Sequence, residues 1–177
     1  MEELRATKDD IRNDVAKRLS ALADTKIKDK VRKIEKRLFE FANFLEANIV
    51  LLYINSANEV NSQQIIRKCF EINKIVILPA FNTDTYEMRL MKVDNIDTDL
   101  ILGPRGILEP DESRCNIVPI ECIDIAIIPG TAFDEKGGRI GSGEGYYDRL
   151  IPQLMITTRK VALAFEDQIV QQIQMEA

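Results

Sequence analysis

The first part of the chain carries apolar side chains at steps of three and four, which is the spacing of one face of an α-helix. A first helix is predicted to begin at Thr7, because the sequence TKDD at 7–10 resembles a capping box with Asp in place of the usual Glu. A second helix is predicted from about Ile27 to Ala47. The apolar positions that define the two helices are Ile11, Val15, Leu19 and Leu22, followed by Ile27, Val31, Ile34, Leu38, Phe41 and Leu45.

Downstream, four short apolar runs alternate with polar segments. The runs occupy residues 49–54, 74–78, 123–128 and 160–165 and are nearly continuous, which is typical of strands buried on both faces of a parallel sheet. Between the first two runs, residues 61–70 have helical spacing. This alternation of strand and helix predicts βαβ crossovers and an α/β fold.

The remaining segments have weaker patterns. Apolar and polar residues alternate over 85–93, as in a strand with one solvent-exposed face, so we expect an antiparallel edge strand there. Pro79 is expected to end the strand before it. Residues 95–121 are predicted to form a long loop that could fold over a ligand. A short helix is predicted from Glu166 to Met175. No repeat or low-complexity linker divides the chain, so a single domain over residues 1–177 is predicted.

The stretch from Ile123 to Leu150 carries the strongest functional signal. Its apolar run ends at Pro129-Gly130, and a glycine-rich loop then leads into a segment with helical spacing of its apolar groups. Glycine lets backbone N–H groups approach a polyanion closely, and a helix N-terminus behind the loop adds partial positive charge. We interpret the stretch as a nucleotide-phosphate site, with a flexible surface turn as the alternative. Five of the chain's eight glycines lie here, at Gly137, Gly138, Gly141, Gly143 and Gly145.

Three charged residues stand where a ligand could meet them. Lys8 lies at the centre and Arg12 at the margin of the first helix's apolar stripe, so both are directed toward the body of the protein. An equally good alternative is that the long side chains of these two cations run along the apolar face and reach water with their charged ends. Glu59 follows the strand at 49–54, where open α/β sheets bind ligands. From position alone, an acid that merely precedes a helix is the better explanation of Glu59.

Composition narrows the functional classes. With 177 residues, 45% of them hydrophobic, the chain is long enough for one core. Its formal charge of −5 argues against general nucleic-acid or anionic-membrane binding, and no apolar run approaches the roughly 18 residues of a membrane span. A cytoplasmic protein is therefore predicted. The three cysteines lack C-x-x-C spacing, and the absence of histidine excludes Ser-His and Cys-His nucleophile pairs.

Four motifs extend this interpretation. They are T-K-x-x-I-R at 7–12, N-E-V at 58–60, G-x-L-E-P at 106–110 and P-G-x-A-F-D-x-x-G-x-R-x-G-x-G-x-G-Y-Y-D at 129–148. Together they resemble the 5-formyltetrahydrofolate cyclo-ligase family, also called methenyltetrahydrofolate synthetase, over nearly the whole chain. The resemblance implies a three-layer α/β/α sandwich with a mainly parallel central sheet, of the NagB/RpiA/CoA-transferase type. It also implies ATP-dependent, Mg²⁺-requiring closure of 5-formyltetrahydrofolate to 5,10-methenyltetrahydrofolate, with ADP and phosphate released.

The resemblance further implies roles for individual residues. Asp148 matches a magnesium-binding carboxylate, although an acid favoured by the helix dipole would explain it equally well. Catalytic roles are implied for Arg139, Lys8 and Tyr146. The residues that match ATP-binding positions are Lys8, Arg12, Arg139, Ile140, Gly141, Ser142, Gly143, Glu144, Gly145, Tyr146 and Tyr147. Those that match folate-binding positions are Ile54, Glu59, Ser142, Gly143, Glu144, Gly145 and Tyr146.

Two departures from the family pattern bear on the site. Ser142 and Glu144 stand where many members have arginine and glycine. This removes a cation and adds an anion beside the proposed phosphates, unless Glu144 points outward or helps to hold Mg²⁺. The family pattern also continues beyond Ala177 with an Asp-bearing segment and a final strand. We therefore expect the domain to lack its C-terminal strand and the second metal ligand.

The predicted partners are small molecules, namely ATP and 5-formyltetrahydrofolate, with Mg²⁺ as the metal. No nucleic-acid or membrane partner is expected, and the predicted state is a monomer or a weak homodimer. A non-catalytic nucleotide or folate binder on the same fold is the alternative function. A sugar-phosphate isomerase or acyl-transfer relative is a weaker hypothesis, because a shared fold does not carry function.

Overall fold

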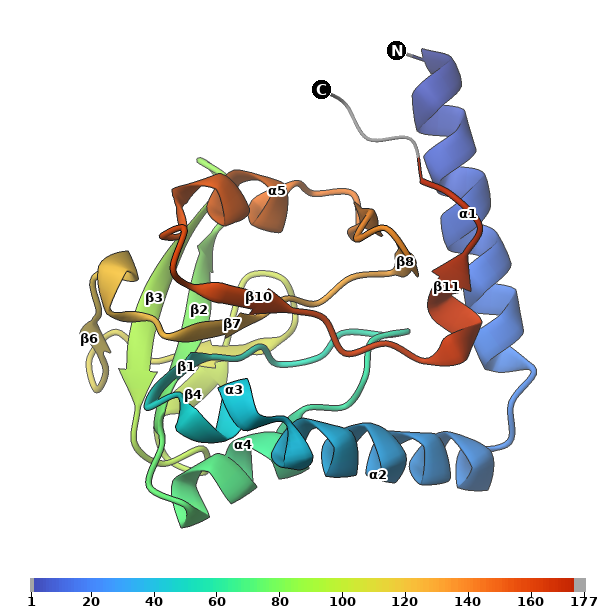
Figure 1. The fold of residues 1–177 in the computed structure, drawn as a ribbon. Coiled ribbons are helices and arrows are strands. Elements are labelled where there is room, and N and C mark those ends of the chain that lie inside the picture. Colours follow the sequence, from blue (N-terminus) through green and yellow to red (C-terminus); the bar gives the residue numbers. More distant parts are fainter. Residues whose placement is uncertain (1, 174–177) are drawn as a thin grey trace.

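The computed structural model describes residues 2–173 and places a central sheet between two layers of helices (Figure 1). Six strands of the described residues form this sheet in the order β10-β7-β1-β2-β3-β6. The first four are parallel, β3 is antiparallel to β2, and β6 is antiparallel to β3. In chain order they are β1 Ile49–Leu51, β2 Ile75–Asn82, β3 Glu87–Val93, β6 Asn116–Ile117, β7 Ile125–Ile127 and β10 Arg159–Val161.

The central strands are buried on both faces, as their continuous apolar runs predicted. In β1, Val50 packs into a hydrophobic cluster on one face of the sheet and Leu51 into a second cluster on the other face. Ile125 and Ala126 of β7 divide between the two clusters in the same way. The α/β fold and its mainly parallel sheet therefore follow from the alternation of these side chains.

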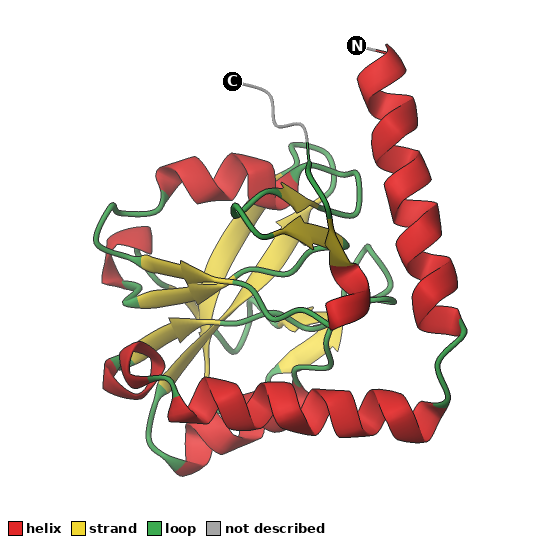
Figure 2. Ribbon diagram, turned by 45° about the vertical axis from the view of Figure 1, so that its right-hand side comes forward, coloured by secondary structure: helices red, strands yellow, loops and turns green. Residues whose placement is uncertain are grey.

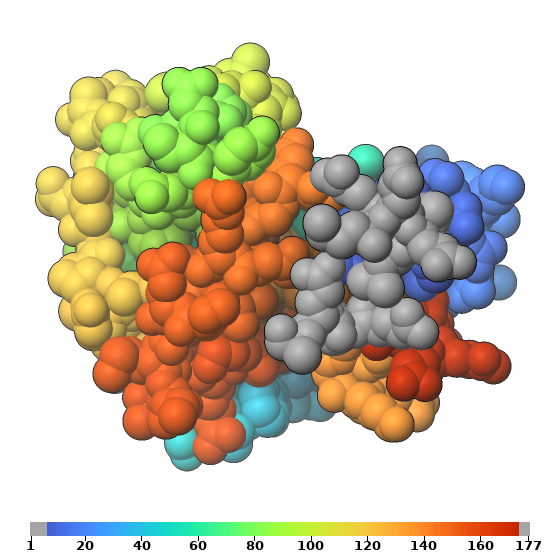
Figure 3. All heavy atoms as spheres, turned by 90° about the horizontal axis from the view of Figure 1, so that it is seen from above, coloured from blue at the N-terminus to red at the C-terminus, as the bar shows by residue number. Residues whose placement is uncertain are grey.

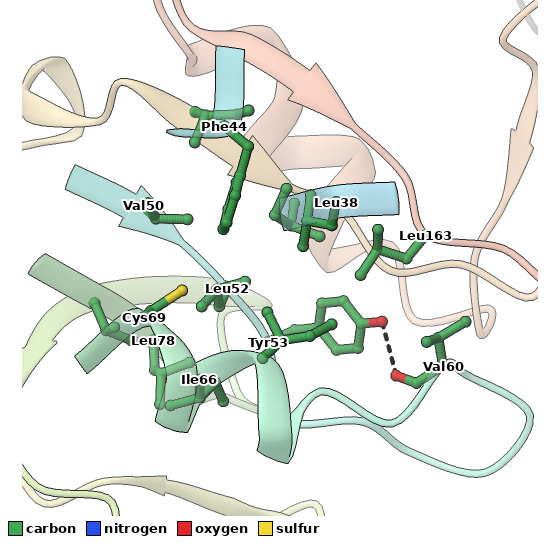
Figure 4. Close-up of a cluster of buried hydrophobic side chains, with 14 of the residues drawn as sticks. Leu38, Phe44, Val50, Leu52, Tyr53, Val60, Ile66, Cys69, Leu78 and Leu163 are labelled. Atoms are coloured by element: carbon green, nitrogen blue, oxygen red, sulfur yellow. Dashed lines mark hydrogen bonds between the residues drawn. The ribbon is translucent and has the colours of Figure 1, made fainter. Parts of the chain in front are cut away.

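Helices cover both faces of the sheet (Figures 1 and 2). α2 Asp24–Glu40, α3 Ala42–Glu46 and α4 Gln63–Glu71 lie on one face. α5 Tyr146–Leu150, continued by a 3-10 turn at Ile151–Gln153, lies on the other. Figure 4 shows part of the first interface, where side chains of all three helices meet the sheet. Those labelled include Leu38 of α2, Phe44 of α3, Ile66 of α4 and Val50 of β1.

Helix α1, Glu2–Ser20, stands at the side of the molecule next to a small sheet (Figures 1 and 2). It packs there through Val15 and Leu19, which are buried. The order of the small sheet is β11-β8-β9. None of the described helices is both long and apolar enough to cross a membrane. The remaining elements are β4 Leu100–Leu102, β5 Leu108–Pro110, β8 Ala132–Asp134, β9 Arg139–Ile140, β11 Ile169–Val170 and 3-10 turns at Ile120–Cys122 and Glu166–Gln168.

Two predicted helix boundaries are wrong. α1 begins at Glu2 rather than at Thr7, since no glycine or proline in the preceding segment stops the helix. The predicted helix from Ile27 to Ala47 is two helices, because Phe41 adopts an extended backbone (φ −79°, ψ 114°) between α2 and α3. The N–H of Phe41 donates to the carbonyl oxygen of Leu38 and closes the last turn of α2.

Pro79 was predicted to end the second strand, and this prediction is wrong. Pro79 lies inside β2, opposite Leu90 of β3. The pairing between β1 and β2 extends only to Ile77, whose carbonyl oxygen accepts the N–H of Leu52. Beyond Ile77, β2 has a strand neighbour on one side only. A residue without an N–H is tolerated at such an edge-like position.

The predicted helix from Glu166 to Met175 is also wrong over the described residues, and Gln174 and Met175 lie outside them. A 3-10 turn and β11 occupy this segment. The fully buried Gln168 side chain determines its path. The Gln168 amide donates to three backbone carbonyl oxygens and accepts the N–H of Phe165 at 2.9 Å. These tertiary hydrogen bonds outweigh the local helical spacing.

Both long loops contain short strands that their sequences did not reveal. Residues 95–121 include β4, β5 and β6, and residues 129–144 include the β8–β9 hairpin. Because β6 pairs with β3, the predicted strand at 85–93 is antiparallel, as expected, but does not lie at the edge of the sheet.

Candidate active site

A pocket opens beyond the carboxyl ends of β1, β2 and β7, between the glycine-rich loop and the β4–β5 loop. This is the usual place of ligand sites in open α/β sheets. The hollow measures about 590 Å³, part of it open to solvent. Figure 3 views the molecule from the side of α5 (orange), with α1 (blue) to the right. The residues that the sequence predicted for the site and that line this pocket are Ile54, Glu59, Arg139, Gly141, Ser142, Gly145, Tyr146, Tyr147 and Asp148.

The glycine-rich loop runs from the end of β9 to the start of α5. Gly143 and Gly145 have φ values of +109° and +79°, which L-residues with side chains rarely adopt. Gly141 is needed for a different reason, since a Cβ there would lie 2.9 Å from Nη2 of Arg139. The loop thus turns sharply and leaves room for a guanidinium directly beside its backbone.

Arg139 is the more buried of the two arginines that line the pocket, with a side chain only 12% exposed. Its Nε donates to the carbonyl oxygen of Pro129 at 2.7 Å, and its Nη1 donates to Oδ1 of Asp148 at 3.1 Å. The guanidinium carbon lies 5.5 Å from the centroid of the Tyr147 ring. Burial lowers the pKa of Arg139 and the charge of Asp148 opposes this shift. Arginine remains a cation at neutral pH, so a fixed positive charge faces the pocket.

Arg12 brings the far end of the chain to the same loop. Its Nε donates to the carbonyl oxygen of Gly141 at 2.9 Å, while its Nη1 pairs with Asp9 at 2.6 Å. The guanidinium carbon lies 3.8 Å from where a Cβ of Gly143 would stand. The prediction that Arg12 points inward is confirmed. Neither Arg12 nor the half-buried Lys8, one turn earlier, lines the pocket, so the ATP-binding roles of both and the catalytic role of Lys8 remain predictions.

Glu59 lies on the wall formed by the segment after β1. Its Oε1 accepts hydrogen bonds from the backbone N–H and the hydroxyl of Ser56, at 2.7 and 2.5 Å. Burial raises the pKa of Tyr147, and the negative charge of Glu59 raises it further. Glu59 lines the pocket, as the family resemblance implied although its position alone did not favour it, and its folate-binding role remains a prediction. The two bonds from Ser56 hold its carboxylate in one orientation.

Aromatic and aliphatic side chains form the opposite wall. The rings of Phe81 and Tyr146 meet edge to face with centroids 4.9 Å apart, and both side chains are largely buried. Pro79, Ile107 and Leu108 complete this surface. A flat, apolar ligand group would lose water-exposed area against it.

Arg105 is the charged residue of the pocket lining that the sequence reasoning missed. It lies in the turn between β4 and β5, and its side chain is 15% exposed. Its guanidinium carbon lies 4.2 Å from the centroid of the Phe81 ring and 5.1 Å from that of Tyr146. The loop at 95–121 was predicted as one that could fold over a ligand. Within it, the position of Arg105 between Gly103 and Gly106 was the signal that could have identified this residue.

Glu144 and the remaining predicted loop residues do not line the pocket. Nε of Arg105 donates to Oε2 of Glu144 at 3.0 Å, so the added anion of the loop has a cationic partner. Ile140 is 2% exposed and its side chain belongs to the core. An ATP contact of Ile140 would therefore have to use its backbone.

Asp148 is two-thirds exposed at the pocket wall and pairs with Arg139. Among the described residues, no group of three or more Cys, Asp and Glu side chains is arranged to hold a metal ion. Mg²⁺ in nucleotide sites is usually held by one or two carboxylates together with phosphate oxygens. A single carboxylate in this position fits that pattern, and the metal-binding role of Asp148 remains a prediction.

The fold and the pocket together define a mixed α/β protein with its ligand site at the ends of parallel strands. Residues 4–177 match the 5-formyltetrahydrofolate cyclo-ligase family. The chain belongs to this family, as its motifs predicted.

Individual relatives agree with this assignment. The solved structure of Aquifex aeolicus 5,10-methenyltetrahydrofolate synthetase is 30% identical, with a TM-score of 0.81 over 96% of this chain and 84% of that one. The Escherichia coli K12 5-formyltetrahydrofolate cyclo-ligase is 24% identical over 163 residues, covering 92% of this chain and 90% of that protein. The Haemophilus influenzae cyclo-ligase is 33% identical over 106 residues, which are 60% of this chain and 57% of that protein. These names indicate cyclo-ligase activity for the family.

Proposed function

We propose that this chain catalyses the ATP-dependent closure of 5-formyltetrahydrofolate to 5,10-methenyltetrahydrofolate, with release of ADP and phosphate. Family membership supports the reaction. The observation that carries it in this chain is one pocket in which a glycine-rich loop held by arginines adjoins an apolar aromatic wall. Such a pocket suits two co-substrates, one polyanionic and one with flat rings, placed side by side.

The nucleotide would occupy the side of the glycine-rich loop. Arg139 is fixed there by Pro129 and Asp148, and Arg12 is fixed by Gly141. Backbone N–H groups of the loop would supply further donors to phosphate oxygens. Since phosphoryl transfer depends mainly on positioning and on charge neutralisation, these donors are sufficient without histidine.

The folate would occupy the side of Phe81 and Tyr146. Its rings would rest against the apolar wall, and Glu59 would accept hydrogen bonds from their N–H groups. Ile54, next to Glu59 in the lining, would contribute apolar contact. Tyr146 belongs both to the loop side and to the aromatic wall, which supports its predicted contact with both substrates.

The proposed reaction has two steps. The formyl oxygen attacks the γ-phosphorus of ATP, the bond to the bridging oxygen breaks, and ADP leaves. N10 of the folate then attacks the activated formyl carbon, N10 loses its proton, and phosphate leaves with the former formyl oxygen. In both steps the role of Arg139 is to hold and neutralise phosphate oxygens, and no side-chain nucleophile is required.

Mg²⁺ would be held by Asp148 and by phosphate oxygens. When bound, it would neutralise part of the phosphate charge. Because Asp148 also accepts a hydrogen bond from Arg139, its carboxylate orients that guanidinium independently of the metal. Asp148 therefore has a positioning role that does not depend on which ion is present.

Substitution of Arg139 tests the proposal. Arg139→Ala should lower kcat/KM for methenyl-product formation by about 100-fold or more, because a donor to transition-state charge is typically worth that much. The matched control is Arg67→Ala. Arg67 lies on α4 and forms an exposed ion pair with Asp97, so this variant should behave as the unsubstituted protein. Undiminished turnover of Arg139→Ala would remove this residue from the mechanism.

Three finer predictions belong to the same proposal. They are a NagB/RpiA/CoA-transferase-type sandwich, a cytoplasmic location, and a monomer or weak homodimer. The two helical layers around a mainly parallel sheet support the first. The formal charge of −5 supports partners that are small molecules rather than nucleic acid.

A further inference from the structure

Arg105 and Glu144 form an ion pair that joins two loops distant in the sequence, and of the two residues only Arg105 lines the pocket. A tight turn holds Arg105 at its tip, with hydrogen bonds from the N–H of Gly103 to the Ile107 oxygen at 2.9 Å and from the N–H of Gly106 to the Gly103 oxygen at 3.1 Å. The backbone of Arg105 is therefore fixed before any ligand arrives.

The Arg105 guanidinium is mostly buried, yet only part of it is engaged. Nε donates to Glu144, and one face of the group lies over the Phe81 ring. Among the described residues, its two terminal nitrogens make no hydrogen bond, although Arg105 lines the pocket. Burial raises the pKa of the Glu109 carboxyl and the positive charge of Arg105 opposes this shift, but Arg105 donates no hydrogen bond to it. A largely buried cation with free donors in a pocket is suited to bind an oxyanion.

Arg105 and Arg139 bracket the glycine-rich loop. Arg139 lies in β9, where the loop starts, and its guanidinium lies over Tyr147 of α5. Arg105 lies over Tyr146 and pairs with Glu144 near the end of the loop. The side of Arg105 is also the side of the apolar wall. In the proposed function, the phosphoryl group that is transferred must lie between the nucleotide on the loop and the folate on that wall.

We propose that Arg105 binds oxygens of the terminal phosphoryl group of ATP through its two terminal nitrogens, and that Glu144 positions Arg105 for this contact. The inference rests on the proposed function for the identity of the nucleotide. A carboxylate of the folate offers the same oxyanion chemistry. The phosphoryl group is favoured because Arg105 is paired with the glycine-rich loop itself.

Calorimetric binding measurements on Arg105→Gln, with one substrate at a time, distinguish the phosphoryl group from the folate carboxylate as the oxyanion bound by Arg105. We expect the affinity for ATP to fall about 10- to 100-fold, as for a lost charged hydrogen bond, with little change for ADP or 5-formyltetrahydrofolate. Arg105→Lys, which keeps the charge, should recover part of the ATP affinity. Arg67→Gln is the control for loss of a guanidinium from an exposed pair.

Glu144→Gln distinguishes a ligand-binding role from a merely structural ion pair. The glutamine oxygen still accepts from Nε of Arg105, and the change removes a negative charge near the phosphates. ATP affinity should therefore rise a few-fold in Glu144→Gln while it falls in Arg105→Gln. A merely structural pair predicts no rise in ATP affinity in Glu144→Gln, because the bond from Nε of Arg105 is kept.

The inference and the proposed function can fail separately. A thermal unfolding scan first shows that Arg105→Gln is folded. If this variant then binds ATP as the unsubstituted protein does, the phosphoryl contact is refuted, even if turnover persists. A selective loss of 5-formyltetrahydrofolate affinity would also refute it and assign Arg105 to a folate carboxylate. If the unsubstituted chain binds ATP and makes no product, the loss of ATP binding in Arg105→Gln would still support the contact.

Discussion

At the scale of single residues, the pocket depends on positions that lack a side chain as much as on those that carry charge. Arg12 and Arg139 both approach the glycine-rich loop at Gly141, where the missing side chain leaves space for the Arg139 guanidinium. Glycine spacing predicted the loop, and the apolar stripe of the first helix indicated an inward direction for Arg12, whereas Arg139 was implied only by the family resemblance. The sequence did not predict Arg105, because its position depends on how the β4–β5 loop folds back over the sheet.

Gly141→Ala should weaken ATP binding by about tenfold through displacement of Arg139. The new Cβ would stand 2.9 Å from Nη2, and the flexible end of the arginine can move away with little strain. The melting temperature should therefore change by less than about 2 °C. Calorimetric titration with ATP and a thermal scan check both halves. Unchanged ATP affinity would show that the guanidinium position is not important for the nucleotide.

Glu109 predicts a pH dependence of stability. Its side chain is 5% exposed, its Oε1 accepts the N–H of Phe81 at 3.2 Å, and its Oε2 has no hydrogen-bond partner. Burial raises the pKa of the folded carboxyl above its ordinary 4.5, although the Phe81 N–H and nearby arginines oppose the shift. The folded state then holds the proton more tightly, so the stability from Glu109 is fully present below 4.5 and is lost as pH rises through the folded pKa.

Glu109→Gln should remove this pH dependence, since the amide does not titrate. In urea unfolding at about pH 4 and about pH 8, the unsubstituted protein should lose stability relative to the variant at the higher pH. Glu112→Gln, a more exposed neighbour, serves as the control. Parallel pH profiles of Glu109→Gln and the unsubstituted protein would contradict the raised pKa.

At the scale of elements, the sequence predicted what burial determines and missed what tertiary contacts determine. The central strands were identified because both of their faces are buried, which leaves a continuous apolar run. Pro79 was misleading because the pairing of β2 with β1 stops before it. The C-terminal segment has helical spacing, yet the bonds of Gln168 fold it into a 3-10 turn and a strand.

Gln168→Ala should therefore destabilise the fold by about 2–4 kcal/mol, because several buried backbone groups lose their partner. The amide of Gln168 donates to the carbonyl oxygens of Gly130 and Thr131, between β7 and β8, and to that of Asn58, beside Glu59. Gln171→Ala, at an exposed position three residues later, should stay within about 0.5 kcal/mol. Urea unfolding followed by circular dichroism measures both. Equal stability of the two variants would show that Gln168 does not hold these loops.

At the scale of the whole molecule, the chain brings five distant segments together: four line the pocket, and α1 contacts the glycine-rich loop through Arg12 without lining the pocket. The five segments are α1, the segment after β1, the end of β2, the β4–β5 loop and the glycine-rich loop. The family motifs covered four of the five segments, namely α1, the segment with Glu59, the β4–β5 region at 106–110 and the glycine-rich loop. Phe81 and Arg105 could not be found in this way, because only the folded sheet places β2 and the β4–β5 loop against the glycine-rich loop.

The central claim is that this pocket couples ATP cleavage to closure of the folate ring. The most direct test incubates the unsubstituted chain with ATP, Mg²⁺ and 5-formyltetrahydrofolate and follows methenyl-product absorbance together with ADP release. We expect the two products to form in equal amounts, and neither to form when one substrate is omitted. Thermal stabilisation by ATP without any methenyl product would contradict the claim and identify the chain as a non-catalytic nucleotide binder.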